Sequence, residues 1–110
     1  YYMKAEAILR GGNAATLSAL CAEPAFQLIR ERANQPVYTP ETLTLDELIN
    51  ERGREFAWEG WRRQDLVRWD KFAKGSWTFK EALNNNSRDL FPIPYYQITK
   101  NQSWKQNPGY

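Results

Sequence analysis

The stretch LDELINERGREFAWEGWRRQDLVRW, residues 45–69, carries the strongest helical pattern in the chain. Apolar residues recur along it at the spacing of one helix face, as an amphipathic helix requires. Arg52, Glu59 and Arg63 fall on that same face. Because an unpaired charge is costly to bury, we expect these three side chains to neutralise one another inside the protein. The pattern therefore predicts one long helix, running to about Asp70, that ion pairs hold in its packing position.

The start of this helix has its own local signal. Thr44 precedes it and Glu47 follows three residues later, which is the spacing of a capping box. Gly53 and Gly60 are the positions where we expect the helix to bend, because glycine has a low helix propensity.

Four carboxylates follow one another at four-residue intervals along the same stretch: Glu47, Glu51, Glu55 and Glu59. Two neighbouring rungs could reach the roughly 5 Å separation of a retaining glycosidase, so a glycoside hydrolase stays open as an alternative. The other interpretation is a ladder of structural ion pairs. All five basic residues of residues 45–69 are Arg, whose planar fork suits fixed bidentate pairing, and this favours the ladder. The candidate partners are Arg54, Arg62 and Arg63, with Arg30 and Arg32 from the preceding helix.

Shorter helices are predicted upstream. Residues 1–10, YYMKAEAILR, show helical spacing, and the pair Gly11-Gly12 ends it. Residues 13–22 fit a short helix. A further helix, PAFQLIRERAN at residues 24–34, begins at a proline whose missing N–H costs nothing in a first turn. Its predicted buried side consists of Phe26, Leu28 and Ile29. Short links between such helices favour antiparallel pairs.

The last third of the chain is predicted to be irregular. A short helix is possible near residues 78–83, and residues 95–100 fit one helical turn. Residues 89–94, DLFPIP, must be extended, because each proline excludes its predecessor from the helical region. The fold class is therefore mostly α, with helix pairs followed by an extended, irregular C-terminal segment.

Composition narrows the chemistry. The chain has 110 residues and a formal net charge of +2, whereas nucleic-acid binders usually carry a strong basic patch, so we expect no nucleic acid as a partner. It contains no His and one Cys. We therefore expect no metal and no cofactor, and a buried structural thiol at Cys21. No apolar run approaches the roughly 20 residues of a membrane-spanning helix.

Aromatic residues make up 15% of the chain and include five Trp. Flat aromatic faces either pack in a core or stack on apolar ligands such as sugar rings. Trp77 and Trp104 fall in predicted loops, where binding residues concentrate, so they are weak candidates for ligand contact. Trp58 and Trp61 face away from the apolar stripe, so we expect either a second layer of the protein or a ligand to cover them, and we favour the second layer.

Three motifs together resemble one family. ERGREFAWEGWRRQDLVRW, residues 51–69, resembles a signature helix of the SusD/RagB family. LFPIP, residues 90–94, followed by QNPGY, residues 106–110, resembles the closing motif of that family. AEAILRGG and AFQLIRERAN, residues 5–12 and 25–34, resemble the segment that precedes the signature helix. The motifs occur in the order and spacing of the family.

The resemblance implies a tetratricopeptide-like helical body and a protein that binds without catalysis. Members are outward-facing, lipid-anchored proteins of the outer membrane in Bacteroidetes. They bind an oligosaccharide or a peptide and partner a SusC-like TonB-dependent transporter. The resemblance implies that residues 1–110 are the C-terminal part of such a domain and that the lipid anchor lies outside them. The resemblance transfers no catalytic or binding residue. Alternatives are a glycoside hydrolase and a helical scaffold without a small ligand.

Overall fold

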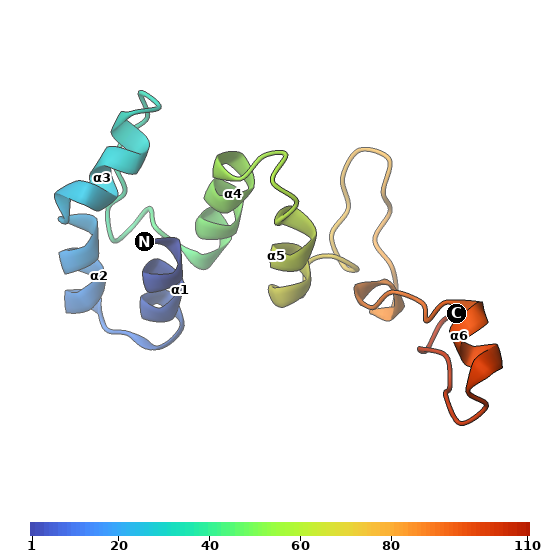
Figure 1. Cartoon of the computed structure of the whole chain (residues 1–110). Helices are drawn as coiled ribbons and strands as arrows, with labels where there is room; N and C mark the ends of the chain where they lie inside the picture. Colours follow the sequence, from blue (N-terminus) through green and yellow to red (C-terminus); the bar gives the residue numbers. More distant parts are fainter. The chain divides into compact units, whose positions relative to one another are not determined.

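The computed structural model describes all residues, 1–110, as short helices joined by loops and turns (Figure 1). It contains no β-strand, which confirms the mostly α prediction. The chain divides into two compact units, Tyr1–Gly60 and Trp61–Tyr110, here named the N-terminal unit and the C-terminal unit. No helix combines the length and the apolar content that crossing a bilayer requires.

The N-terminal unit consists of four helices. In chain order they are α1 (Tyr2–Gly11), α2 (Ala14–Cys21), α3 (Pro24–Glu31) and α4 (Leu45–Glu55). Helix α1 packs against both α2 and α4, and α2 packs against α3. The three short helices before residue 35 therefore form where the sequence predicts them, although α3 ends before Asn34, which has a φ of 52°.

Local capping explains where these helices begin and end. Helix α1 ends at the predicted glycine pair, and a Cβ at Gly12 would lie 2.7 Å from the Ile8 carbonyl oxygen. Asn13 and Thr16 form a capping box at the start of α2. At α4 the Thr44 hydroxyl accepts a hydrogen bond from the Glu47 backbone N–H at 3.1 Å. The Glu47 carboxylate is used elsewhere, so only the Thr44 half of the predicted box is formed.

The apolar core of the protein lies almost entirely in the N-terminal unit. Its buried side chains are Tyr2, Ala5, Leu20, Cys21, Phe26, Tyr38, Leu43, Leu48 and Ile49. Cys21 is a buried free thiol as predicted, and burial, followed by the charge of Glu41, raises its pKa. Leu28 was expected to be buried beside Phe26, but it is 61% exposed. Two residues along a helix correspond to about 200° of rotation, so Leu28 faces the opposite side.

The prediction of one continuous helix over residues 45–69 is wrong. Helix α4 ends at Glu55, residues 56–60 form turns, and a separate helix α5 (Arg62–Arg68) follows. Trp58 has a φ of 69° and Gly60 a φ of 80°, and both values lie in the left-handed region that an α-helix cannot use. Gly60 adopts this conformation at no steric cost, so the expected bend is a full interruption.

The C-terminal unit contains α5, the 3-10 helix η1 (Ser87–Asp89) and α6 (Tyr95–Lys100). Between α5 and η1 the chain makes a tight turn in which Trp77 and Lys80 pair through two backbone hydrogen bonds. This turn replaces the short helix predicted near residues 78–83. Ala73 is the one fully apolar side chain buried in this unit, and Asp65 is buried with it.

The C-terminal tail is fastened to the extended segment at residues 90–94. The Gln106 amide accepts a hydrogen bond from the Ile93 N–H and donates one to the Ile93 carbonyl, both at 2.8 Å. Asn107 Nδ2 donates to the Phe91 carbonyl at 2.7 Å, and the Tyr110 hydroxyl donates to the Leu90 carbonyl at 2.9 Å. The two closing motifs of the sequence thus bind each other directly.

Candidate ligand-binding site

Two neighbouring hollows lie in the C-terminal unit. The first, here named the amide pocket, has a volume of about 460 Å³ and is lined by Asn85, Asn86, Ser87, Leu90, Pro108 and Gly109. The second, the aromatic groove, has a volume of about 470 Å³. It is lined by Arg63, Phe72, Phe79, Lys80, Glu81, Leu83, Arg88, Phe91 and Tyr110. Both volumes lie in the range of small-ligand sites in proteins.

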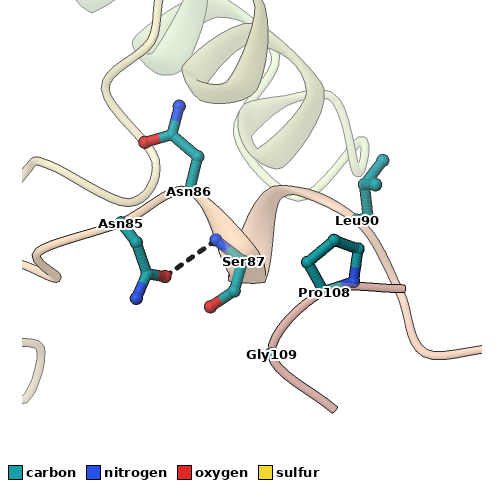
Figure 2. Close-up of a pocket in the computed structure, with 6 residues that line it drawn as sticks. All are labelled: Asn85, Asn86, Ser87, Leu90, Pro108 and Gly109. Carbon is teal, nitrogen blue, oxygen red and sulfur yellow. Dashed lines mark hydrogen bonds between the residues drawn. The ribbon is translucent and has the colours of Figure 1, made fainter. Parts of the chain in front are cut away.

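The amide pocket brings polar groups and apolar groups to opposite sides (Figure 2). Asn85 Oδ1 accepts a hydrogen bond from the Ser87 backbone N–H at 3.0 Å, which fixes the Asn85 side chain. Asn86 Nδ2 donates to Asp70 Oδ1 at 2.9 Å. Leu90 and Pro108 supply the apolar side. A pocket of this kind can bind a ligand that has both hydroxyl groups and a hydrocarbon face.

Glycine is required at the base of the amide pocket. Gly109 has a φ of 93°, and a Cβ there would lie only 2.4 Å from the Ser87 Cβ. The tail can therefore approach η1 closely only because residue 109 has no side chain.

Arg63 joins the walls of the aromatic groove. Its guanidinium lies 4.9 Å from the centre of the Phe72 ring and 4.0 Å from that of Phe91. Its Nη2 donates to the backbone carbonyls of Arg88 at 2.9 Å and Asp89 at 3.0 Å. Arg63 thus connects α5 to η1 and to the extended segment through cation–π contacts and hydrogen bonds.

The predicted cluster of Arg52, Glu59 and Arg63 is therefore wrong. Glu59 is exposed to solvent, and Arg52 lies over the Phe56 ring at 5.2 Å. The cluster was inferred from the phase of one helix, and that helix ends at Glu55. Residues beyond this point no longer share its face.

The predicted ladder of ion pairs is confirmed for three of its four carboxylates. Arg30 binds Glu51 at 2.7 Å, and Arg54 binds the same carboxylate at 2.7 Å. Arg54 also pairs with Glu47, and Arg32 pairs with Glu55. The arginines come from α3, the turn after it and α4 itself.

This ladder has the wrong electrostatics for a catalytic acid. Burial opposes the ionisation of Glu51, but the hydrogen bond from Arg54 and the charge of Arg30 outweigh it, so its pKa is lowered from 4.5. A glycosidase acid needs a raised pKa in order to donate a proton near neutrality. The Arg partners therefore favour a structural role for these carboxylates.

Trp77, one of the two candidates from the sequence, is 46% exposed at the start of the tight turn. The Lys80 ammonium lies 4.5 Å from the centre of its ring and donates hydrogen bonds to the carbonyls of Ala73, Gly75 and Glu81. The Phe72 ring lies 6.4 Å away, tilted by 51°. Trp77 is therefore fixed in place beside the aromatic groove but does not line it.

Trp104, the other candidate, lies in the tail and is 48% exposed. It lines neither hollow, and the structure does not bring it together with Trp77. Trp58 is fully exposed and Trp61 is 48% exposed.

Sequence reasoning missed the residues that line the two hollows. The run Asn84–Ser87 indicates only a polar loop, and Phe79 and Phe91 fall on no predicted amphipathic face. One signal was present: the two closing motifs, residues 90–94 and 106–110, border both hollows. Their pairing could have indicated that a site lies between them.

A family comparison agrees with this architecture. The profile of the SusD family matches residues 1–110, and the chain therefore belongs to this family. One relative is the starch-binding protein SusD of Bacteroides thetaiotaomicron, which is 38% identical over 117 aligned residues. The alignment covers 100% of this chain but only 20% of that relative, so the chain spans about a fifth of the relative's length.

Proposed function

We propose that this protein binds glycans at a bacterial cell surface and does not cleave them. The observation that carries the proposal is membership of the SusD family, together with 38% identity to a starch-binding protein. The paired state of Glu47, Glu51 and Glu55 supports binding without hydrolysis, because these carboxylates are occupied by arginines.

The C-terminal unit offers the surface for such binding. Sugar rings present an apolar face and a rim of hydroxyl groups, and the two hollows combine exposed aromatic rings with amide side chains. Trp77, beside the aromatic groove, and Trp104, in the tail, stay candidate contacts, each with about half of its side chain exposed.

In the cell the bound ligand would pass to a SusC-like TonB-dependent transporter of the outer membrane. The protein would face outward, held by a lipid anchor, as the SusD family resemblance implies. Residues 1–110 would form the C-terminal part of the binding domain. The ligand class would be an oligosaccharide, with a peptide as the second possibility.

A direct test is calorimetric titration of the 110-residue protein with maltoheptaose and a panel of other oligosaccharides. We expect saturable binding and no release of reducing sugar on long incubation. Release of reducing sugar would identify a hydrolase, and a complete lack of binding to oligosaccharides and peptides would favour a scaffold.

A matched pair of variants locates the contact. Trp77→Ala should weaken binding about tenfold, which is the lower end of the roughly 1–3 kcal/mol that a nucleobase gains by stacking on one aromatic side chain. Trp58→Ala removes an equally large ring that is fully exposed in the N-terminal unit, and it should leave the affinity unchanged. Equal losses in both variants would argue against a site in the C-terminal unit.

A further inference from the structure

The two units of the chain carry net charges of opposite sign, which nearly cancel in the whole chain. The N-terminal unit has six Lys and Arg against nine Asp and Glu, whereas the C-terminal unit has nine against four. The C-terminal unit therefore carries a formal charge of +5, although it has only 50 residues. A positive field of this kind attracts anionic ligands.

The aromatic groove carries part of this positive charge. Arg63, Lys80 and Arg88 line it, and Glu81 is the one acidic residue among the lining side chains. Arg63 and Lys80 use hydrogen-bond donors on backbone carbonyls, which position them but do not neutralise their charge. The groove thus keeps an excess of cations.

Arg88 is the cation that is available to a ligand. Its guanidinium lies 5.2 Å from the centre of the Tyr110 ring, and the side chain is exposed. It forms no hydrogen bond or ion pair within the protein, whereas its backbone carbonyl is held by Arg63. A guanidinium oriented by a ring and free of acceptors can bind a carboxylate or sulfate with two parallel hydrogen bonds.

The groove also presents two exposed aromatic rings. Phe79 at the tip of the tight turn is fully exposed, and Phe91 is 70% exposed. Phe79 has a φ of 66°, an uncommon conformation for a bulky residue. Backbone strain of this kind is concentrated at functional sites, and here it displays a phenyl ring that contributes nothing to the core.

We propose that the aromatic groove binds an acidic glycan, one whose sugar rings carry carboxylate or sulfate groups. The ring face of the sugar lies against Phe79 and Phe91, and Arg88 binds the anionic group. This inference rests on the proposed function and narrows it from glycans in general to anionic ones.

The geometry favours a glycan over an acidic protein surface. The exposed rings of Phe79 and Phe91 can stack on the apolar face of a sugar ring, which an acidic protein surface does not offer. Residues that line the amide pocket are adjacent in sequence to residues that line the groove, since Ser87 precedes Arg88 and Gly109 precedes Tyr110. Neutral amide and hydroxyl groups beside a cationic groove match the alternation of hydroxyls and acid groups on an acidic oligosaccharide.

The test is calorimetric titration of the whole chain with oligogalacturonate, maltoheptaose and poly-L-glutamate at two salt concentrations. We expect oligogalacturonate to bind at least about tenfold more tightly than maltoheptaose, since one hydrogen bond to a charged group is worth about that factor. The preference should shrink as salt rises, because solvent-exposed charges are screened. Poly-L-glutamate should bind weakly, since it has charge without sugar rings.

Single variants distinguish binding in the aromatic groove from attraction by the positive charge of the whole C-terminal unit. Arg88→Gln should weaken oligogalacturonate binding about tenfold, whereas Lys105→Gln, which removes the same charge from an exposed position outside both hollows, should have little effect. Phe79→Ala should weaken binding without changing the melting temperature, because the ring is fully exposed.

Three outcomes would overturn the inference. Equal affinity for maltoheptaose and oligogalacturonate would remove the acidic preference and leave the proposed function intact. Equal effects of Arg88→Gln and Lys105→Gln, or tight poly-L-glutamate binding that does not depend on Phe79, would replace a glycan groove with a surface that responds to charge alone. Failure of every glycan to bind would instead remove the proposed function itself.

Discussion

The two units of this chain use their aromatic and charged residues in opposite ways. In the N-terminal unit Tyr2, Phe26 and Tyr38 are buried, and the carboxylates of α4 are paired with arginines. In the C-terminal unit Phe79 and Phe91 are exposed, and Arg63 and Lys80 donate hydrogen bonds to backbone carbonyls. The same residue types thus build a core in one unit and a surface in the other.

Local sequence order accounts for this difference. The N-terminal unit has four helices long enough to present an apolar face, so its rings can pack between them. The C-terminal unit has helices of seven residues or fewer and long loops, which expose side chains and position them through hydrogen bonds to the backbone. The first unit therefore buries its aromatic rings, whereas the second leaves Phe79 and Phe91 exposed.

The largest expected effect is on the core of the N-terminal unit. Leu48 is completely buried, and Leu48→Ala should lower the free energy of unfolding by about 2–5 kcal/mol through lost burial and a residual cavity. Urea titration followed by circular dichroism measures this change. Leu83→Ala in the C-terminal unit, where the side chain is 37% exposed, is the matched control and should cost far less. Similar losses in the two variants would remove the contrast between the units.

The next effect concerns the ion-pair ladder. Glu51→Gln leaves Arg30, whose side chain is only 15% exposed, without its counter-charge. The expected loss is about 2–3 kcal/mol, below the full cost of breaking a buried pair because Arg54 is half exposed. Thermal unfolding of the variant beside the unsubstituted protein provides the measurement. An unchanged melting temperature would mean that the ion-pair ladder does not contribute to stability.

The same carboxylate predicts a dependence on pH. The pKa of Glu51 in the folded protein lies below 4.5, its ordinary value. Ionised Glu51 therefore contributes fully to the free energy of unfolding above the pKa of the unfolded state, and this contribution is lost as the pH falls through the pKa of the folded state. The urea midpoint of the parent should therefore decline below about pH 4.5. The urea midpoint of Glu51→Gln should decline less steeply with falling pH. Parallel curves of midpoint against pH for the two proteins would contradict the role assigned to Glu51.

A smaller effect is expected at the base of the amide pocket. Gly109→Ala places a methyl group against Ser87 in a backbone conformation that alanine disfavours, so the tail should detach at a cost of about 1–2 kcal/mol. The Ile93 amide, which donates to Gln106 in the tail, should then exchange its hydrogen faster. Gly11→Ala meets nothing within 4 Å and should leave this exchange rate unchanged.

The smallest effect is expected at Glu59. Its side chain is exposed, so Glu59→Ala should give a thermal melt that overlaps that of the parent protein. A large destabilisation would revive the charged cluster with Arg52 and Arg63 and would argue that residues 45–69 form one helix in solution.

Local signals made much of the N-terminal unit predictable. The glycine pair after α1, Pro24 at the start of α3 and Thr44 at the start of α4 each act within a few residues of the chain. The ladder was also predictable, because Glu and Arg at fixed spacing on a helix leave few alternatives for pairing. Helix α6 and the extended residues 90–94 followed from the same kind of local rule.

The interruption after Glu55 and the two hollows were not predictable in this way. Apolar residues on both sides of the interruption keep the phase of a single helix, so periodicity alone could not reveal the left-handed backbone at Trp58. The aromatic groove combines Arg63, Phe91 and Tyr110, which are separated by up to 47 positions. Their proximity depends on loop conformations that no local pattern records.

The two hydrogen bonds between the Gln106 side chain and the Ile93 backbone affect how the protein associates with other molecules. An extended segment with unpaired backbone groups invites a strand from another molecule to add to it. Pro92 and Pro94 have no N–H, and the single N–H between them is already bound by Gln106. The Gln106 amide therefore occupies the backbone groups of Ile93 that a strand from another molecule would need. This segment should resist intermolecular sheet formation even at high protein concentration.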